Sequence, residues 1–234
     1  MLIPSQAWGI DTDIDSKLVE RNLNDIKKDI AHCKTKIIAV TKYFGLKAIE
    51  AGYEAGIRDF AESRVQDALK KFDVLSDEIR QNSTFHFIGH LQSNKVKKVV
   101  EHFDVIQSVD SLKIAEAISE AACAINKKER VLLQVNNAGE EQKSGFSKEV
   151  LKGELSKILT LKGIEIVGLM NMAPLGASET TLRQLFGDIR EFKNELEREF
   201  NVVLSELSMG MSDDYKIAVA EGATMIRIGR KLFT

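Results

Sequence analysis

Near its C-terminus the chain reads Leu204-Ser205-Glu206-Leu207-Ser208-Met209-Gly210-Met211-Ser212-Asp213-Asp214, and shortly afterwards Gly222-Ala223-Thr224-Met225-Ile226-Arg227-Ile228-Gly229-Arg230. Each stretch predicts a short buried strand that ends in glycine or small hydroxyl residues. Ser212, followed by two acids, is the expected N-cap of the helix between the two strands. Turns of this kind leave backbone N–H groups free, so the two strand ends together predict a phosphate-binding site.

The rest of the chain alternates between apolar runs of strand length and amphipathic segments of helix length. Continuous apolar runs are typical of parallel strands that are covered on both faces. Strands are predicted at residues 36–40, 58–62, 85–89, 104–108, 131–135 and 164–170, and around Leu204 and Met225. Helices are predicted at residues 13–33, 46–55, 65–80, 94–102, 112–126, 148–159 and, as the longest, around 182–196.

Eight such strand-helix steps predict an α/β fold, a single (β/α)₈ TIM barrel with an extra N-terminal helix. A doubly wound open sheet is the alternative, because strand order cannot be read from one sequence. The barrel is favoured because eight parallel strands in one small domain close more readily than they stay open. We expect residues 1–234 to form one domain, with residues 1–35 as an N-terminal arm, carrying Trp8, and helix.

Composition excludes several classes of function. The chain has 33 Lys and Arg against 35 Asp and Glu, so a nucleic-acid or anionic-membrane surface is not expected. No apolar run approaches the roughly 18 residues of a membrane span, and no signal peptide is recognisable. Cys33 and Cys123 are interpreted as buried free thiols, which indicates a cytoplasmic protein. The spacing of the four histidines matches no metal site.

Lys42 directly follows the first predicted strand, at the end of the barrel where active sites lie. On its position alone it could be an ordinary exposed lysine. The first and last strands of a closed barrel are neighbours, however, so the phosphate site would lie beside it. A lysine amine next to a phosphate site is the minimum needed to hold pyridoxal 5'-phosphate (PLP) as a Schiff base.

Several motifs resemble those of the pyridoxal phosphate homeostasis proteins. They are Ala39-Val40-Thr41-Lys42, Phe60 to Gln66, Phe85 to Lys95, Lys143-Ser144-Gly145, Gly168-Leu169-Met170, Leu207 to Asp214, and Arg227-Ile228-Gly229. The resemblance implies a barrel like the N-terminal domain of alanine racemase, with Lys42 as the Schiff-base lysine. It also implies that the other cofactor-binding residues are Ser63, Met209, Ser212, Arg227, Gly229 and Arg230, with Arg227 near the ring and Ser212, Gly229 and Arg230 at the phosphate.

Four positions depart from the pattern of that family. Ser63 replaces an Asn, His90 replaces a Pro, Tyr43-Phe44-Gly45 follows the lysine, and Arg230 replaces a Thr or Ser. Ser63 has a shorter reach than Asn. Arg230 either pairs with the phosphate or turns outward and contributes only its amide.

The resemblance implies a PLP-binding protein of vitamin B6 homeostasis with little or no catalysis of its own and no catalytic or metal-binding residues. The alternative is a PLP-dependent amino-acid racemase or lyase, and a third option is a sugar-phosphate barrel enzyme that uses Lys42 without a cofactor. Racemisation needs a second base, which alanine racemase takes from an extra domain that we do not expect after Thr234. The expected partners are PLP and PLP-dependent apoenzymes, and the expected state is a monomer or weak dimer.

Three further residues are interpreted as structural. His86 lies between two phenylalanines in a predicted strand, which is typical of a hydrogen-bonded core histidine. Met170 and Met172 are expected to pack at the barrel mouth rather than to contact a cofactor.

Overall fold

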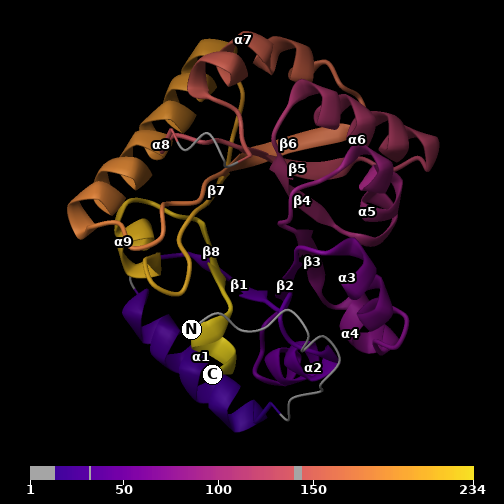
Figure 1. Ribbon diagram of the computed structural model, residues 1–234, viewed down its shortest axis with the longest axis vertical. Coiled ribbons are helices and arrows are strands. Elements are labelled where there is room, and N and C mark those ends of the chain that lie inside the picture. The colour runs from indigo at the N-terminus through magenta and orange to yellow at the C-terminus, as the bar shows by residue number, and fades with distance from the viewer. Residues whose placement is uncertain (1–13, 32, 140–143) are drawn as a thin grey trace.

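Eight parallel strands close into a barrel in the computed structural model, which describes residues 14–31, 33–139 and 144–234 (Figure 1). The strands follow each other in chain order, and the barrel closes where β1 pairs with β8. The predicted barrel is confirmed and the open sheet is wrong. The strands are β1 (Lys36–Val40), β2 (Asp59–Glu62), β3 (Thr84–Phe87), β4 (Val105–Val109), β5 (Glu129–Gln134), β6 (Ile164–Met170), β7 (Glu206–Ser208) and β8 (Met225–Ile228).

Helices form an outer ring around the strands (Figure 1). They are α1 (Ser16–Asp29), α2 (Leu46–Glu54), α3 (Val65–Phe72), α4 (Asp77–Gln81), the 3₁₀ turn η1 (Ser93–Lys95), α5 (Val96–His102), α6 (Leu112–Ala124), α7 (Lys148–Leu159), α8 (Glu179–Phe200), α9 (Tyr215–Ala220) and α10 (Arg230–Phe233). The predicted extra helix is α1, which lies beside α10, and Asn22 Nδ2 donates to the Leu232 carbonyl over 3.1 Å. None of the helices in the described ranges is long and apolar enough to cross a bilayer.

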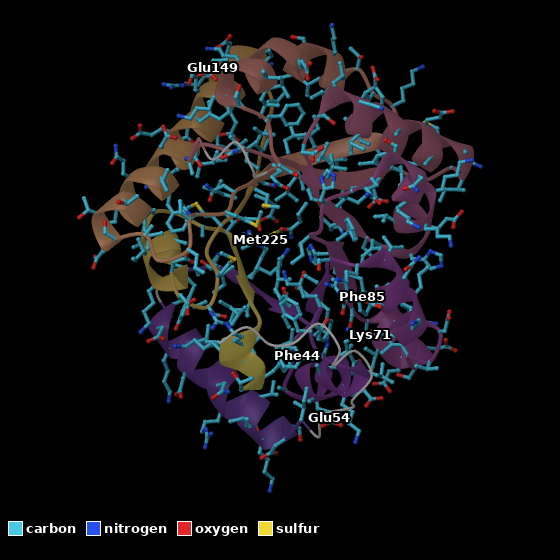
Figure 2. All side chains as sticks on the ribbon, in the orientation of Figure 1. Phe44, Glu54, Lys71, Phe85, Glu149 and Met225 are labelled. Carbon is cyan, nitrogen blue, oxygen red and sulfur yellow. The ribbon has the colours of Figure 1, made fainter. Side chains whose placement is uncertain are left out.

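The alternation of side chains along each strand creates two cores. Ala39 belongs to the large core between strands and helices, whereas Ile38 and Val40 point into the barrel. Inside the barrel they pack against Ala61 and Met225, and Figure 2 shows Met225 near the centre of the ring of strands. Because all eight strands are parallel, the residues that follow their C-terminal ends lie together at one mouth of the barrel.

The predicted helix over residues 65–80 is in fact two helices. Helix α3 ends at Phe72, and α4 starts at Asp77 after Ser76, whose hydroxyl accepts from the Ile79 N–H. A serine N-cap followed by two acids is a helix-start signal, and here it starts a new helix although the apolar pattern continues across residues 65–80.

Two other predictions are wrong. Ser212 does not cap the helix between β7 and β8, because α9 starts at Tyr215 with Asp214 at the N-cap position, and the Ser212 hydroxyl instead accepts from the Lys231 N–H over 3.5 Å. Cys33 and Cys123 are free but exposed, because Cys33 lies in the loop after α1 and Cys123 lies in the last turn of α6 on a face that the core does not cover. The predicted arm with Trp8 lies outside the described residues.

Candidate functional site

A cavity of about 230 Å³ opens at the C-terminal mouth of the barrel, beside Lys42. The loops after β1 and β7, together with the end of β8 and the start of α10, bring together Lys42, Ser212, Arg227, Gly229 and Arg230 around it. These are five of the seven predicted site residues. The other lining residues are Val40, Tyr43, Phe44, Ile88, Met170, Met172, Leu175, Met211 and Asp213.

The Lys42 side chain is half-buried and available. Its amine lies 5.0 Å from the centre of the Tyr43 ring, and within the described ranges it makes no hydrogen bond or ion pair. An amine without a carboxylate partner in a largely apolar cavity can act as a nucleophile once it loses its proton. The geometry therefore suits covalent attachment of a carbonyl compound.

A buried ion pair anchors the backbone on which Lys42 stands. Lys71 Nζ donates to Glu62 Oε1 over 2.7 Å and to the Thr41 carbonyl over 2.9 Å. The Thr41 hydroxyl also donates to Glu62 Oε1, over 2.6 Å. Burial raises the pKa of Glu62, against the opposing effect of Lys71. The ion-pair partner of Glu62 is thus Lys71 on α3.

Free backbone amides also line the cavity. The N–H groups of Ser212, Asp213, Gly229 and Arg230 have no acceptor within the described part of the chain. The turn that presents the first two starts at Gly210, whose φ is +91° and where a Cβ would lie 2.5 Å from the Ala218 Cβ. Several unpaired N–H groups around one cavity favour an anion such as a phosphate.

Arg227 supplies a buried positive charge at the floor of the cavity. Its side chain is almost fully buried, and its Nη1 and Nη2 donate to Ser208 Oγ over 2.7 Å and to the Asn171 carbonyl over 2.8 Å. Burial lowers its pKa to about 10, so it stays protonated at neutral pH. These bonds use two of its five N–H groups. The others can donate to an acceptor in the cavity.

Two predicted residues do not line this cavity. Ser63 lies in a neighbouring hollow of about 390 Å³ together with His90 and Lys95, because its backbone packs against Gly89 and its short side chain does not reach further. The Met209 side chain points into the core between strands and helices, since it follows the inward-pointing Ser208. Its N–H is bonded to the Met225 carbonyl over 3.1 Å.

Arg230 turns outward. Its guanidinium pairs with Asp213 over 2.8 Å, and both side chains are about two-thirds exposed, at 65% and 66%. Of the two arrangements left open by the sequence, the structure has the one in which Arg230 offers its amide. His90, the second unusual residue, contacts Asp110 and Ser144 at the rim, each over 3.1 Å.

Of the residues interpreted as structural, His86 behaves as expected, whereas Met170 and Met172 both pack at the mouth and line the cavity. His86 is buried and hydrogen-bonded to Asp59 and Gln107. Met170 packs in a small interior cluster with Met172 at its edge, although both also border the cavity. Sequence reasoning missed Gln107, and the signal was available, since a glutamine interrupts the apolar run Val105-Ile106.

Known proteins share this sequence pattern. The chain is 46% identical over 198 residues to a protein of Synechocystis sp. named "Pyridoxal phosphate homeostasis protein", covering 85% of this chain and 90% of that protein. The chain belongs to the family of pyridoxal phosphate homeostasis proteins. A second family member, from Aquifex aeolicus, is 39% identical over 198 residues, 85% of this chain and 86% of that protein. Residues 14–234 also match the family described as alanine racemase, N-terminal domain.

Solved structures agree with this family assignment. PipY of Synechococcus elongatus without PLP superposes with a TM-score of 0.87 at 39% identity, covering 92% of this chain and 100% of that chain. PipY with PLP bound gives a TM-score of 0.83 at 37% identity, with the same coverage. Alanine racemase of Clostridium difficile, at 18% identity and a TM-score of 0.77, shares the fold over 94% of this chain and 57% of its own.

Proposed function

We propose that this protein binds PLP in the cavity at the barrel mouth, as a Schiff base on Lys42, and serves PLP homeostasis in the cell. The observation that carries the proposal is that the amine of Lys42 and four backbone amides, all without a hydrogen-bond partner among the described residues, share one cavity. The names of the family members and the PLP-bound PipY structure support it.

The residues around the cavity fit the parts of this cofactor. The Lys42 amine can form a Schiff base with its aldehyde, and Arg227 can donate to its ring nitrogen. Its phosphate can accept hydrogen bonds from the backbone amides of Ser212, Asp213, Gly229 and Arg230. The volume of about 230 Å³ is somewhat below the roughly 300 to 1,000 Å³ of sites for drug-sized ligands, which suits a single substituted pyridine. Ile88, Met170 and Met172 give the ring an apolar surface.

Arg227 also explains why catalysis should be weak. When bound, PLP supplies an aldehyde for amines and a ring that withdraws electrons from the attached carbon. That withdrawal is strongest when the ring nitrogen carries a proton. A guanidinium only donates hydrogen bonds, so Arg227 leaves the nitrogen unprotonated. This protein is therefore proposed to hold the cofactor with little or no turnover.

A PLP-dependent racemase or lyase remains the alternative. It requires an acid-base group that acts independently of Lys42. Among the described lining residues, Asp213 is paired with Arg230, and the Tyr43 ring adjoins the Lys42 amine itself. Neither is placed as an independent base, which favours the homeostasis role.

The same proposal includes the partners of the protein. Tyr43 and Leu175 at the cavity rim are 60% and 88% exposed, so the bound cofactor would be accessible to a PLP-dependent apoenzyme. We propose such apoenzymes as recipients, a monomer or weak dimer as the working state, and the cytoplasm as the compartment. The free thiols of Cys33 and Cys123 support that compartment.

A Lys42→Ala variant tests the proposal. Wild-type protein mixed with PLP and gel-filtered should be yellow, and borohydride reduction followed by peptide mass spectrometry should place the cofactor on Lys42. Lys42→Ala should emerge colourless, whereas Lys36→Ala, changed at the far end of the same strand, should stay yellow. A fully yellow Lys42→Ala protein would contradict the assignment. Robust turnover in a racemase assay on a panel of amino acids would instead favour the enzyme.

A further inference from the structure

A continuous chain of hydrogen bonds crosses the barrel interior below the cavity. Arg227 Nη1 donates to Ser208 Oγ over 2.7 Å, and Ser208 donates to Gln107 Oε1 over 2.7 Å. Gln107 Nε2 lies 2.9 Å from His86 Nδ1, and His86 Nε2 lies 3.0 Å from Asp59 Oδ1. The chain thus links β8, β7, β4, β3 and β2, from the cavity to the opposite end of the barrel.

The direction of every bond in this chain is determined by its two ends. The Arg227 guanidinium can only donate, and the Asp59 carboxylate can only accept when ionised. Ser208 must therefore donate to Gln107, and Gln107 must donate to His86. The consequence is a neutral His86 that carries its hydrogen on Nε2 and gives it to Asp59.

Two further observations support that single arrangement. The second hydrogen on Gln107 Nε2 faces Met225 Sδ at 3.9 Å, so a flipped amide would turn its oxygen toward sulfur. Burial lowers the pKa of His86 more strongly than Asp59 raises it, and Lys36 and Arg130, the other charged groups that act on it, also lower it. The imidazole therefore remains neutral at physiological pH.

Arg227 depends on this chain because it has no ion-pair partner within the described ranges. Within those ranges its guanidinium donates to the Ser208 hydroxyl and the Asn171 carbonyl, and the Asp214 carboxylate acts on it only through space. Ser208 is itself fully buried, and Gln107 is the acceptor that orients its hydroxyl. Without Gln107 the Ser208 hydroxyl could rotate toward Arg227, where its hydrogen would oppose the guanidinium.

We propose that Gln107 and His86 are positioning residues that hold the Arg227 guanidinium against the ring nitrogen of the cofactor, through Ser208. The proposal rests on the proposed function, since it requires PLP in the cavity. It assigns a role to residues that lie in the middle of their strands and do not line the cavity.

Three variants test the proposal. Gln107→Leu keeps the approximate size of the side chain and removes both hydrogen bonds that Gln107 makes, to Ser208 and to His86. Gln107→Glu offers one oxygen to Ser208 and the other to a doubly protonated His86, so the chain is restored. Gln134→Leu is the matched control, because Gln134 is a buried barrel glutamine that donates to the Ser144 carbonyl over 2.7 Å, outside the chain.

The measurements are PLP retention by equilibrium dialysis and the absorption spectrum of the bound cofactor between pH 6 and 9. Gln107→Leu should retain PLP about fivefold more weakly, the effect of one misplaced hydrogen bond, and its spectrum should titrate differently from that of the wild type. Gln107→Glu should recover most of the wild-type retention and spectrum, and Gln134→Leu should match the wild type. The proposal is overturned if a folded Gln107→Leu protein matches the wild type, if the Glu variant behaves like the Leu variant, or if the control loses as much.

Ser208→Ala provides a second break in the chain if Gln107→Leu does not fold, and it should show the same loss. Failure of the proposed function itself is recognised separately. In the cofactor-free protein, ¹⁵N NMR should show His86 as the neutral Nε2–H form in the wild type and as an imidazolium in Gln107→Glu. If the wild type does not bind PLP but these signals appear as stated, the proposed function is wrong, whereas the hydrogen-bond network from Arg227 to Asp59 is confirmed. If His86 carries its hydrogen on Nδ1, the chain itself is wrong.

Discussion

Ile38 of β1 is paired with Arg227 of β8 at the seam where the barrel closes. Both strands run in the same direction, so the residues that follow them emerge at the same mouth. Lys42 lies four residues beyond Ile38, and Gly229 lies two residues beyond Arg227. This pairing is the reason why an amine from the start of the chain and amides from its end share one cavity.

Gly229 should not tolerate a side chain without loss of PLP. A Cβ at this position would lie 3.2 Å from the Val40 carbonyl oxygen, beside the unpaired amides of Gly229 and Arg230. Gly229→Val should weaken PLP retention by about tenfold or more, because the bulky group displaces the amides from the phosphate. The measurement is dialysis against PLP, with thermal unfolding recorded in parallel.

Gly153→Ala is the control for that experiment. Gly153 lies within α7, and a Cβ there meets nothing within 4 Å. The substitution should leave PLP retention unchanged and stabilise the fold by about 0.5 to 1 kcal/mol through helix propensity. Unchanged retention in a folded Gly229→Val protein would argue against the phosphate site.

Arg230→Thr should bind PLP almost as well as the wild type. Arg230 is paired with Asp213 on the surface, so its contribution to the phosphate site is its backbone amide, which the variant keeps. We expect a change in PLP affinity of about twofold at most, and a loss of stability within about 0.5 kcal/mol, as is usual for an exposed ion pair. A loss of tenfold or more, measured by fluorescence titration, would show that the guanidinium reaches the phosphate.

Lys71→Met should destabilise the fold strongly. The Glu62 carboxylate is 1% exposed and lies 2.7 Å from the Lys71 amine, so removing the cation leaves a buried charge without its partner. The expected loss in the free energy of unfolding is about 3 kcal/mol, measured by urea denaturation. Lys28→Ala, which breaks the exposed pair with Asp25, should cost less than about 0.5 kcal/mol.

A double variant separates charge from packing at the same place. Glu62→Leu with Lys71→Met should recover most of the lost stability, because an apolar pair of similar volume leaves no charge unpaired. If the double variant has the same free energy of unfolding as Lys71→Met, the loss of stability comes from altered packing and not from an unpaired charge.

Glu129 should make stability depend on pH. Burial raises the pKa of Glu129 from its ordinary value of 4.5 to about 7. Between these values the folded protein holds a proton that the unfolded chain has released, so this residue lowers the stability of the fold as pH rises from 4.5 to 7. Above pH 7 the full cost is present, up to roughly 3 kcal/mol.

Glu129→Gln should remove this decrease in stability between pH 4.5 and 7. Its gain in stability at pH 8 should be about 1 to 3 kcal/mol, and it should be near zero at pH 4. Lys127 loses its carboxylate contact in the variant but keeps the carbonyls of Val100 and Phe103. Equal stability of variant and wild type at pH 8, measured by urea denaturation, would show that Glu129 is ionised without cost.

Local patterns were sufficient to predict the order of strands and helices, and their number favoured a barrel. Most strands contain a short apolar run, and many of the turns between elements carry glycine or serine, so the order of elements follows from near neighbours in the sequence. The same patterns located Lys42 at a strand end and the free amides around Ser212 and Gly229. The misses at this level are the break between α3 and α4 and the cap of α9, where short capping signals compete within a few residues.

The sequence by itself determined the strand-helix alternation, the position of the amine and the composition of the anion turns. Only the tertiary structure decided which side chains meet, because that depends on strand register and on closure of the barrel. Register turned Met209 toward the helices and left Ser63 in a neighbouring hollow. Closure brought Gln107 within hydrogen-bonding distance of Ser208, 101 residues further along the chain, and no local pattern encodes a contact at that separation.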